Sequence, residues 1–178
     1  MQLYYNEGFT ETFIWETIGE VSITYNKNSP TKCLNELLAD HFILMNKTMQ
    51  LLMEVRVQAF EKRLEITYTE LKYGVNKIVE YGRFNQASLP LSINNFLHHT
   101  RLQANTSCNN VEVFVEQLIH DYKLTLINSE EDFLRCQNQK LLTKSLFATV
   151  DTILRNNLQV LQDCIKDLRS RCTSVNNG

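Results

Sequence analysis

The sequence predicts an all-α protein: a bundle of four long helices with a long connection between the second and the third. Apolar residues recur at three- and four-residue steps through most of the chain, which is the spacing of one helix face. Only 5 Gly and 2 Pro occur in 178 residues, so long uninterrupted elements are expected. A polar stretch of about 25 residues between the two helical halves is longer than adjacent antiparallel helices need.

The first helix is expected within the stretch from Cys33 to Phe60. Ser29 can cap its first amides, and Pro30 suits the first helical position. The inward stripe is expected to hold Leu34, Leu38, Phe42, Met45, Met49 and Leu52, widened by Leu37, His41 and Leu44.

The second helix follows with almost no interruption. Its stripe consists of Phe60, Leu64, Thr67, Leu71, Val75 and Ile78. No Gly, Pro or strong turn former lies between Glu54 and Lys62, so periodicity alone allows one very long helix or two that meet tightly. Two are favoured, because a helix of about 50 residues is far above the usual length. Gly82 is expected to end the second helix.

The second half of the chain begins with the crossover, in which Ser92 is expected to cap a short helix. Asn110 is expected to cap the third long helix, which runs past Phe133 to a break at Asn138. The fourth carries the stripe Leu142, Leu146, Val150, Ile153, Leu161, Ile165 and Leu168. The bundle is therefore assigned to residues 29–170, with a polar tail at 171–178. Two helices, a long crossover and two helices form the ferritin-like arrangement rather than an up-and-down bundle.

Residues 1–28 have a different pattern. Val21, Ile23 and Tyr25 alternate with polar residues, which predicts a short hairpin or an extended arm. An isolated hairpin is marginally stable, so this extension is expected to pack on its own bundle or on a neighbouring subunit.

Composition excludes several classes of function. The 18 basic and 20 acidic residues give a net charge of −2, which does not favour binding to nucleic acid or anionic membranes. No apolar run is long enough to span a membrane, and no secretory signal is visible. Five scattered cysteines without a C-x-x-C motif predict reduced thiols in a cytoplasmic protein rather than a disulfide framework or zinc site.

Three segments together resemble the Dps proteins, the DNA-protecting ferritin-like proteins of bacteria. They are Leu34–Asp40 with Lys47-Thr48, Gly82-Arg83-Phe84 followed by Leu89-Pro90, and Val115–Tyr122. The resemblance covers about residues 30–168 in order. It implies a four-helix bundle with a short crossover helix and assembly into a hollow dodecamer.

The ligands of the family's iron-oxidising centre are missing from this chain. In the family, two histidines and an aspartate come from the first two helices, and the resemblance aligns them with Leu52, Leu64 and Tyr68. An aspartate and a glutamate four residues apart follow in the family. Here Glu80 stands alone, with Asn76 and Phe84 at the four-residue positions. Apolar side chains cannot replace oxygen and imidazole ligands of iron. The Glu-x-x-His pairs of bundle di-iron proteins are also absent, since Gln117 precedes His120 by three residues.

Other candidate sites are weak. His98 and His99 could ligate a metal with Cys108, but adjacent helical residues diverge, so solvated or capping histidines are favoured. His41 with Glu36 and Asp40 is interpreted as a polar contact between subunits. Cys33 with a distant histidine could form a nucleophile and base, without any local signature. We therefore predict no catalytic, cofactor-binding or metal-ligating residues.

The expected function is a non-catalytic, self-assembling Dps-like subunit with a structural, DNA-protective or iron-storage role and no cofactor. DNA binding is possible but is not supported by charge. The alternative is a helical interaction module that binds another protein, with Phe13, Trp15 and Tyr25 as anchors.

Overall fold

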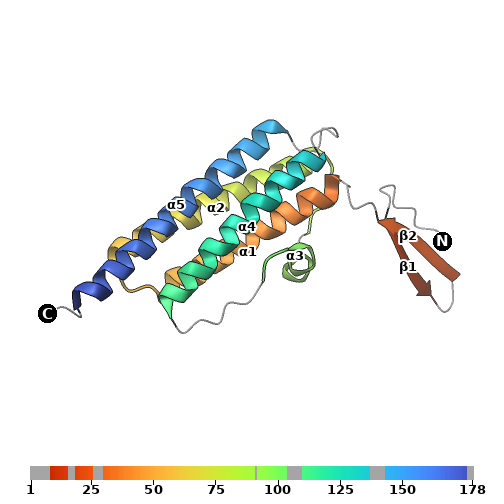
Figure 1. The fold of residues 1–178 in the computed structure, drawn as a ribbon. Helices are drawn as coiled ribbons and strands as arrows, with labels where there is room; N and C mark the ends of the chain where they lie inside the picture. Colours follow the sequence, from red (N-terminus) through yellow and green to blue (C-terminus); the bar gives the residue numbers. More distant parts are fainter. Residues whose placement is uncertain are drawn as a thin grey trace.

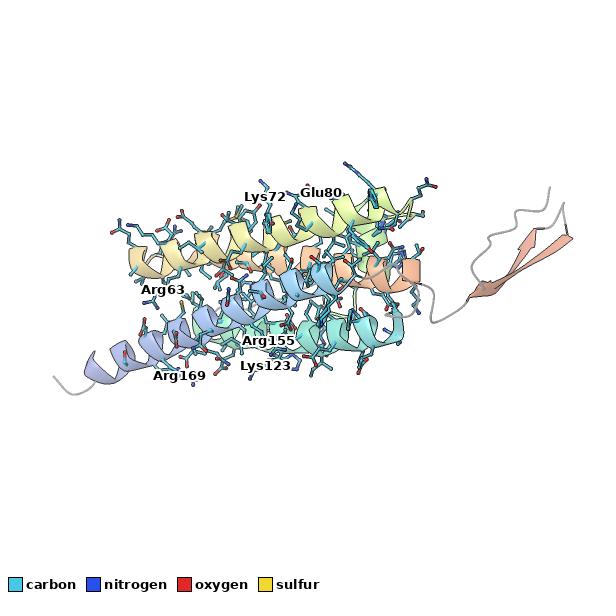
Figure 2. All side chains as sticks on the ribbon, turned by 90° about the horizontal axis from the view of Figure 1, so that it is seen from above. Arg63, Lys72, Glu80, Lys123, Arg155 and Arg169 are labelled. Carbon is cyan, nitrogen blue, oxygen red and sulfur yellow. The ribbon has the colours of Figure 1, made fainter. Side chains whose placement is uncertain are left out.

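Four long helices lie side by side and form the body of the molecule (Figure 1). The computed structural model describes residues 9–15, 19–25, 30–90, 92–103, 110–136 and 143–175. The helices are α1 (Pro30–Glu54), α2 (Gln58–Phe84), α4 (Val111–Cys136) and α5 (Lys144–Val175). Each of the pairs α1–α2, α1–α4, α4–α5 and α2–α5 is in contact, so the helices pack in a ring around one core. Charged side chains such as Lys72, Lys123 and Arg169 project outward from this bundle (Figure 2).

The crossover runs from the end of α2 to the start of α4, which lie at opposite ends of the bundle (Figure 1). It carries the short helix α3 (Ile93–His99), which packs on α1. The rings of Phe96 and Phe42 stack there with their centroids 4.2 Å apart. This long connection distinguishes the fold from an up-and-down bundle and confirms the predicted arrangement.

The predicted helix boundaries mostly agree with the structure. α1 ends at Glu54 and α2 begins at Gln58, so two helices are present rather than one. The Ser92 hydroxyl accepts a hydrogen bond from the Asn95 amide at 3.3 Å, and Asn110 Oδ1 accepts one from Glu112 N at 2.8 Å. Both residues are therefore helix caps as predicted.

Two predicted ends were wrong. α2 continues past Gly82 to Phe84, and the Gly82 carbonyl accepts a hydrogen bond from Ala87 N at 2.9 Å in the turn that follows. α5 continues to Val175, so most of the expected polar tail at 171–178 is helical. The predicted cap Ser29 and the predicted break at Asn138 lie outside the described residues.

The buried face of α1 agrees with the expected one only in part, and the residues buried as predicted are Leu34, Leu37, Leu38, His41 and Leu44. Phe42, Met45, Met49 and Leu52 are only partly buried, whereas Leu51 is fully buried. Two polar residues, Lys47 and Thr48, also lie in the interior, at 1% and 0% exposure. The apolar spacing therefore predicted the helix correctly, but it predicted only part of the buried face.

The hairpin predicted for the N-terminal extension is present. Strand β1 (Phe9–Trp15) pairs antiparallel with β2 (Gly19–Tyr25), and the register places Phe13 opposite Val21. The structure does not describe the side chains of Phe13, Trp15 and Tyr25, which were proposed as anchors for a protein partner. Within the described residues, no helix is long and apolar enough to cross a membrane.

Candidate functional site

Three of the positions that align with the family's iron ligands hold buried or half-buried side chains, and the fourth is exposed. Leu64 on α2 is completely buried in the core, and Leu52 on α1 packs against the core from a half-buried position. Tyr68 is also half-buried. Glu80 faces solvent, where its Oε2 accepts a hydrogen bond from Lys77 Nζ at 2.8 Å. These four residues form no set of iron ligands.

The bundle interior contains acidic groups that iron could in principle use. The first of them, Asp121 on α4, is paired with Lys47 on α1. Lys47 Nζ lies 2.6 Å from Asp121 Oδ2, and the two side chains are 1% and 3% exposed. The second oxygen of Asp121 accepts a hydrogen bond from Gln117 Nε2 at 3.1 Å. The lysine ammonium thus occupies one side of this carboxylate and balances its charge.

Two further buried carboxylates, Asp40 on α1 and Asp132 on α4, meet at Arg101 of the crossover. The guanidinium binds Asp132 with two hydrogen bonds, of 3.1 Å from Nη1 and 2.9 Å from Nη2. Its Nε donates to Asp40 Oδ2 at 2.9 Å, and the Arg101 backbone amide donates to Asp40 Oδ1 at 2.8 Å. The Thr100 hydroxyl donates a further hydrogen bond to Asp40 Oδ1 at 3.0 Å. A planar guanidinium suits such two-sided binding of carboxylates.

This Arg101 cluster extends to the bundle surface. Glu36 lies 3.7 Å from Arg101 and 3.8 Å from Arg135, and Arg135 also forms an ion pair with Asp132. Burial raises the pKa of Asp132, and the charge of Arg101 opposes that shift. The cluster joins α1, the crossover and α4, so it fixes the course of the crossover along the bundle.

All three buried carboxylates of the described chain are therefore neutralised by the protein's own cations. Asp121 is paired with Lys47, and Asp40 and Asp132 are paired with Arg101. A buried charge is stable only when it is paired and hydrogen-bonded, and these pairs meet that need without a metal. Among the described residues no group of three or more His, Cys, Asp or Glu side chains could hold a metal ion.

The centre of the bundle holds a layer of neutral polar groups, one from each long helix. They are Thr48, Thr67, Tyr122 and Asn157, each no more than 1% exposed. The Tyr122 hydroxyl lies beside Thr48 and Asn157, and Asn157 Nδ2 donates to the Thr67 carbonyl at 3.3 Å. Burial raises the pKa of Tyr122, so its phenol remains protonated. Bundle di-iron proteins place glutamates and Glu-x-x-His pairs in this region, and hydroxyl and amide groups do not replace them.

The histidines considered as weak site candidates lie in different environments. His41 is completely buried, with its Nδ1 2.8 Å from the Leu37 carbonyl, and burial lowers its pKa. Its interpretation as a subunit contact was therefore wrong, because the side chain packs inside its own bundle. His98 is exposed and His99 is half-buried on α3. Cys108, their suggested partner, lies outside the described residues.

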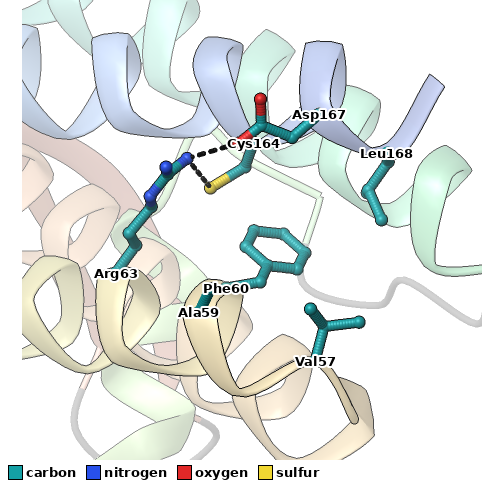
Figure 3. Close-up of a pocket in the computed structure, with 7 residues that line it drawn as sticks. All are labelled: Val57, Ala59, Phe60, Arg63, Cys164, Asp167 and Leu168. Carbon is teal, nitrogen blue, oxygen red and sulfur yellow. Dashed lines mark hydrogen bonds and ion pairs between the residues drawn. The ribbon is translucent and has the colours of Figure 1, made fainter. Parts of the chain in front are cut away.

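Two hollows of different size lie between α2 and α5. One of about 20 Å³ lies between α2 and α5, where Arg63 contacts Asp167 at 2.8 Å and Cys164 Sγ at 4.0 Å (Figure 3). Its volume admits about one water molecule. A second hollow of about 380 Å³ is an open groove between the end of α2 and the start of α5, with Phe84 and Leu146 among its lining residues.

Comparison with known proteins links this geometry to one fold. No protein-family model and no curated protein sequence matches the chain. Solved structures do match. The dodecameric thioferritin from Bacteroides fragilis, a bacterioferritin-related protein, has a TM-score of 0.72 and 13% identity over 82% of this chain and 89% of that one. Dps from Thermosynechococcus elongatus has a TM-score of 0.69 and 11% identity, and the match covers 76% of this chain and 89% of that one. DpsB from Lactococcus lactis has a TM-score of 0.67 and 17% identity, and the match covers 78% of this chain and 82% of that one. This chain has the Dps fold.

The Dps fold accounts for the four helices and the crossover but leaves the chemistry open at such low identity. The paired buried carboxylates were missed by the sequence analysis. A signal for them was present on α4, where Asp121, Thr125, Asn128 and Asp132 follow one another at three- and four-residue steps. Polar residues at that spacing beside the apolar stripe indicate a buried polar seam.

Proposed function

We propose that this chain is a self-assembling subunit of the Dps fold that has no ferroxidase centre of its own. The observation that carries the proposal is the pairing of every buried carboxylate in the described chain with a lysine or arginine. A ferrous ion would have to displace a buried cation, and the displaced cation would then lose its partner. The role that fits such a subunit is structural or protective, as a shell component or as a partner of competent subunits. The scattered cysteines of the sequence suit a cytoplasmic location.

Assembly with further copies is supported by apolar side chains on the outer surface. Ile66 and Tyr73 lie two turns apart on α2 and are 59% and 52% exposed. Ile93 and Leu97 lie one turn apart on α3, at 64% and 43%. Exposed apolar groups arranged in this way are typical of surfaces that a partner covers. The Bacteroides fragilis neighbour is described as dodecameric, and we propose a homo-oligomer here too.

We expect purified protein to oxidise ferrous iron no faster than buffer does. The assay follows the appearance of ferric iron in air, with an iron-free control protein at equal concentration. The same sample is measured by light scattering, so that assembly and chemistry are tested separately. A homogeneous multimer without activity agrees with the proposal. Saturable oxidation that is lost in Glu80→Gln would contradict the missing centre, and a monomer would favour the alternative of a protein-binding module.

A further inference from the structure

Two cysteine thiols from different helices meet at the end of the bundle where α1 begins and α4 ends. Cys33 lies in the first turns of α1, and Cys136 is the last residue of α4. Both are fully buried in the same core cluster, and each thiol is the main influence on the pKa of the other. Each is a free thiol in the structure. The two residues are 103 positions apart in the sequence (136 − 33), so their proximity is a product of the fold.

The charged residues next to the two cysteines hold them together independently of the sulfur contact. Glu36, one turn after Cys33, lies 3.8 Å from Arg135, which directly precedes Cys136. Arg101 lies 3.7 Å from Glu36 and 2.9 Å from Asp132, one turn before Cys136. The start of α1 and the end of α4 are thus joined by ion pairs between residues close to the two cysteines.

The environment also favours reaction of one thiol with the other. The hydrogen bond from Cys136 lowers the pKa of Cys33, and the same pairing with burial raises the pKa of Cys136. A shared proton of this kind makes one sulfur the nucleophile and leaves the second as a resolving thiol. Cys164, the remaining described cysteine, contacts Arg63 on another part of the bundle and has no thiol partner among the described residues.

We propose that Cys33 and Cys136 form a reversible intramolecular disulfide that fastens the start of α1 to the end of α4, with a small-molecule disulfide such as oxidised glutathione as the oxidant. The Cys33 thiolate attacks one glutathione sulfur, which forms a mixed disulfide and releases one reduced glutathione. The Cys136 thiolate then attacks the Cys33 sulfur and releases the second glutathione. Two protein thiols lose two protons and two electrons, and one glutathione disulfide becomes two thiols.

Closure of this bond makes a loop of α1, α2, the crossover and α4, while α5 lies outside it. A loop of this length restricts the unfolded chain strongly, so the oxidised protein should be the more stable form. Formation of the bond requires the two sulfurs to approach to about 2.05 Å. The proposed disulfide thus links α1 to α4 at the end of the bundle where α1 begins.

The test refolds reduced, denatured protein in glutathione buffers of increasing oxidised fraction, so that burial of the thiols cannot block equilibrium. Free thiols are then alkylated, and peptides are mapped by mass spectrometry. We expect a Cys33–Cys136 crosslink that grows with the oxidised fraction and is reversed by dithiothreitol. Cys164→Ser is the matched control and should leave the crosslink unchanged, whereas Cys136→Ser should abolish it. The Tm of the oxidised protein should exceed that of the reduced protein by about 5–15 °C.

Either of two results would overturn the proposal. The first is natively folded protein, judged by circular dichroism, in which both thiols remain open to alkylation or carry separate glutathione adducts at the most oxidising ratio. The second is a crosslinked protein with a lower Tm than the reduced form, because the bond would then form only by distorting the bundle.

Discussion

Lys47→Met should lower the free energy of unfolding by about 3–5 kcal/mol, because it leaves the buried Asp121 carboxylate without its cation. Asp121 is 3% exposed, and Gln117 alone cannot balance its charge. A loss of this size is a large part of the stability of a typical domain. Urea unfolding followed by far-UV circular dichroism measures it.

The matching control is Lys77→Met, since Lys77 forms a similar bond to Glu80 with side-chain exposures of 39% and 65%. That substitution should change stability by no more than about 0.5 kcal/mol. The double variant Lys47→Met with Asp121→Leu should recover most of the loss, because an apolar pair can replace a buried ion pair. Equal effects of the two lysine substitutions would show that the interior pair is not desolvated as the structure has it.

Arg101→Met should have a comparable effect, on the order of 3–5 kcal/mol, since it leaves Asp40 without a cation and Asp132 with Arg135 alone. The two aspartate side chains are 0% and 1% exposed. Arg101→Lys should recover only part of the loss, because a lysine cannot bind two carboxylates through a planar fork. The control Arg155→Met removes exposed pairs with Glu130 and Asp151 and should cost little.

Hydrogen exchange separates a local effect of Arg101→Met from a general one. The backbone amide of Arg101 donates to Asp40, and that of Leu102 donates to Thr100 Oγ1 at 3.1 Å. In the variant we expect peptides covering the crossover residues 93–103 to exchange faster than those of α5. Uniform acceleration through the whole bundle would contradict the role of Arg101 in fixing the crossover.

The helices of this protein could be predicted because local signals carry them. Apolar spacing located all four long helices, and Ser92 and Asn110 marked two helix starts correctly. The buried face of α1 could not be predicted from apolar spacing, because Lys47 is buried through a partner on α4. That pair is 74 residues apart in sequence, and Arg101 and Asp132 are 31 apart. Nothing local indicates which lysine or arginine will meet which aspartate.

The sequence and the structure contribute different parts of the candidate site. Leu52, Leu64 and Tyr68 are visible in the sequence as non-ligands once the resemblance gives their register, and the fold supports that resemblance. The way in which the interior accommodates three aspartates could be seen only in the structure. It lies in the positions of Lys47 and Arg101, which serve as the counter-ions.

Ferrous iron binding under argon tests the central claim most directly, because it does not depend on turnover or on the supply of oxidant. Equilibrium dialysis of the assembled protein against ferrous iron should give a bound amount that rises weakly and in proportion to free iron. A saturable site of one or two ions per subunit that is lost in Asp121→Asn or Asp132→Asn would contradict the account, because iron would then be displacing Lys47 or Arg101.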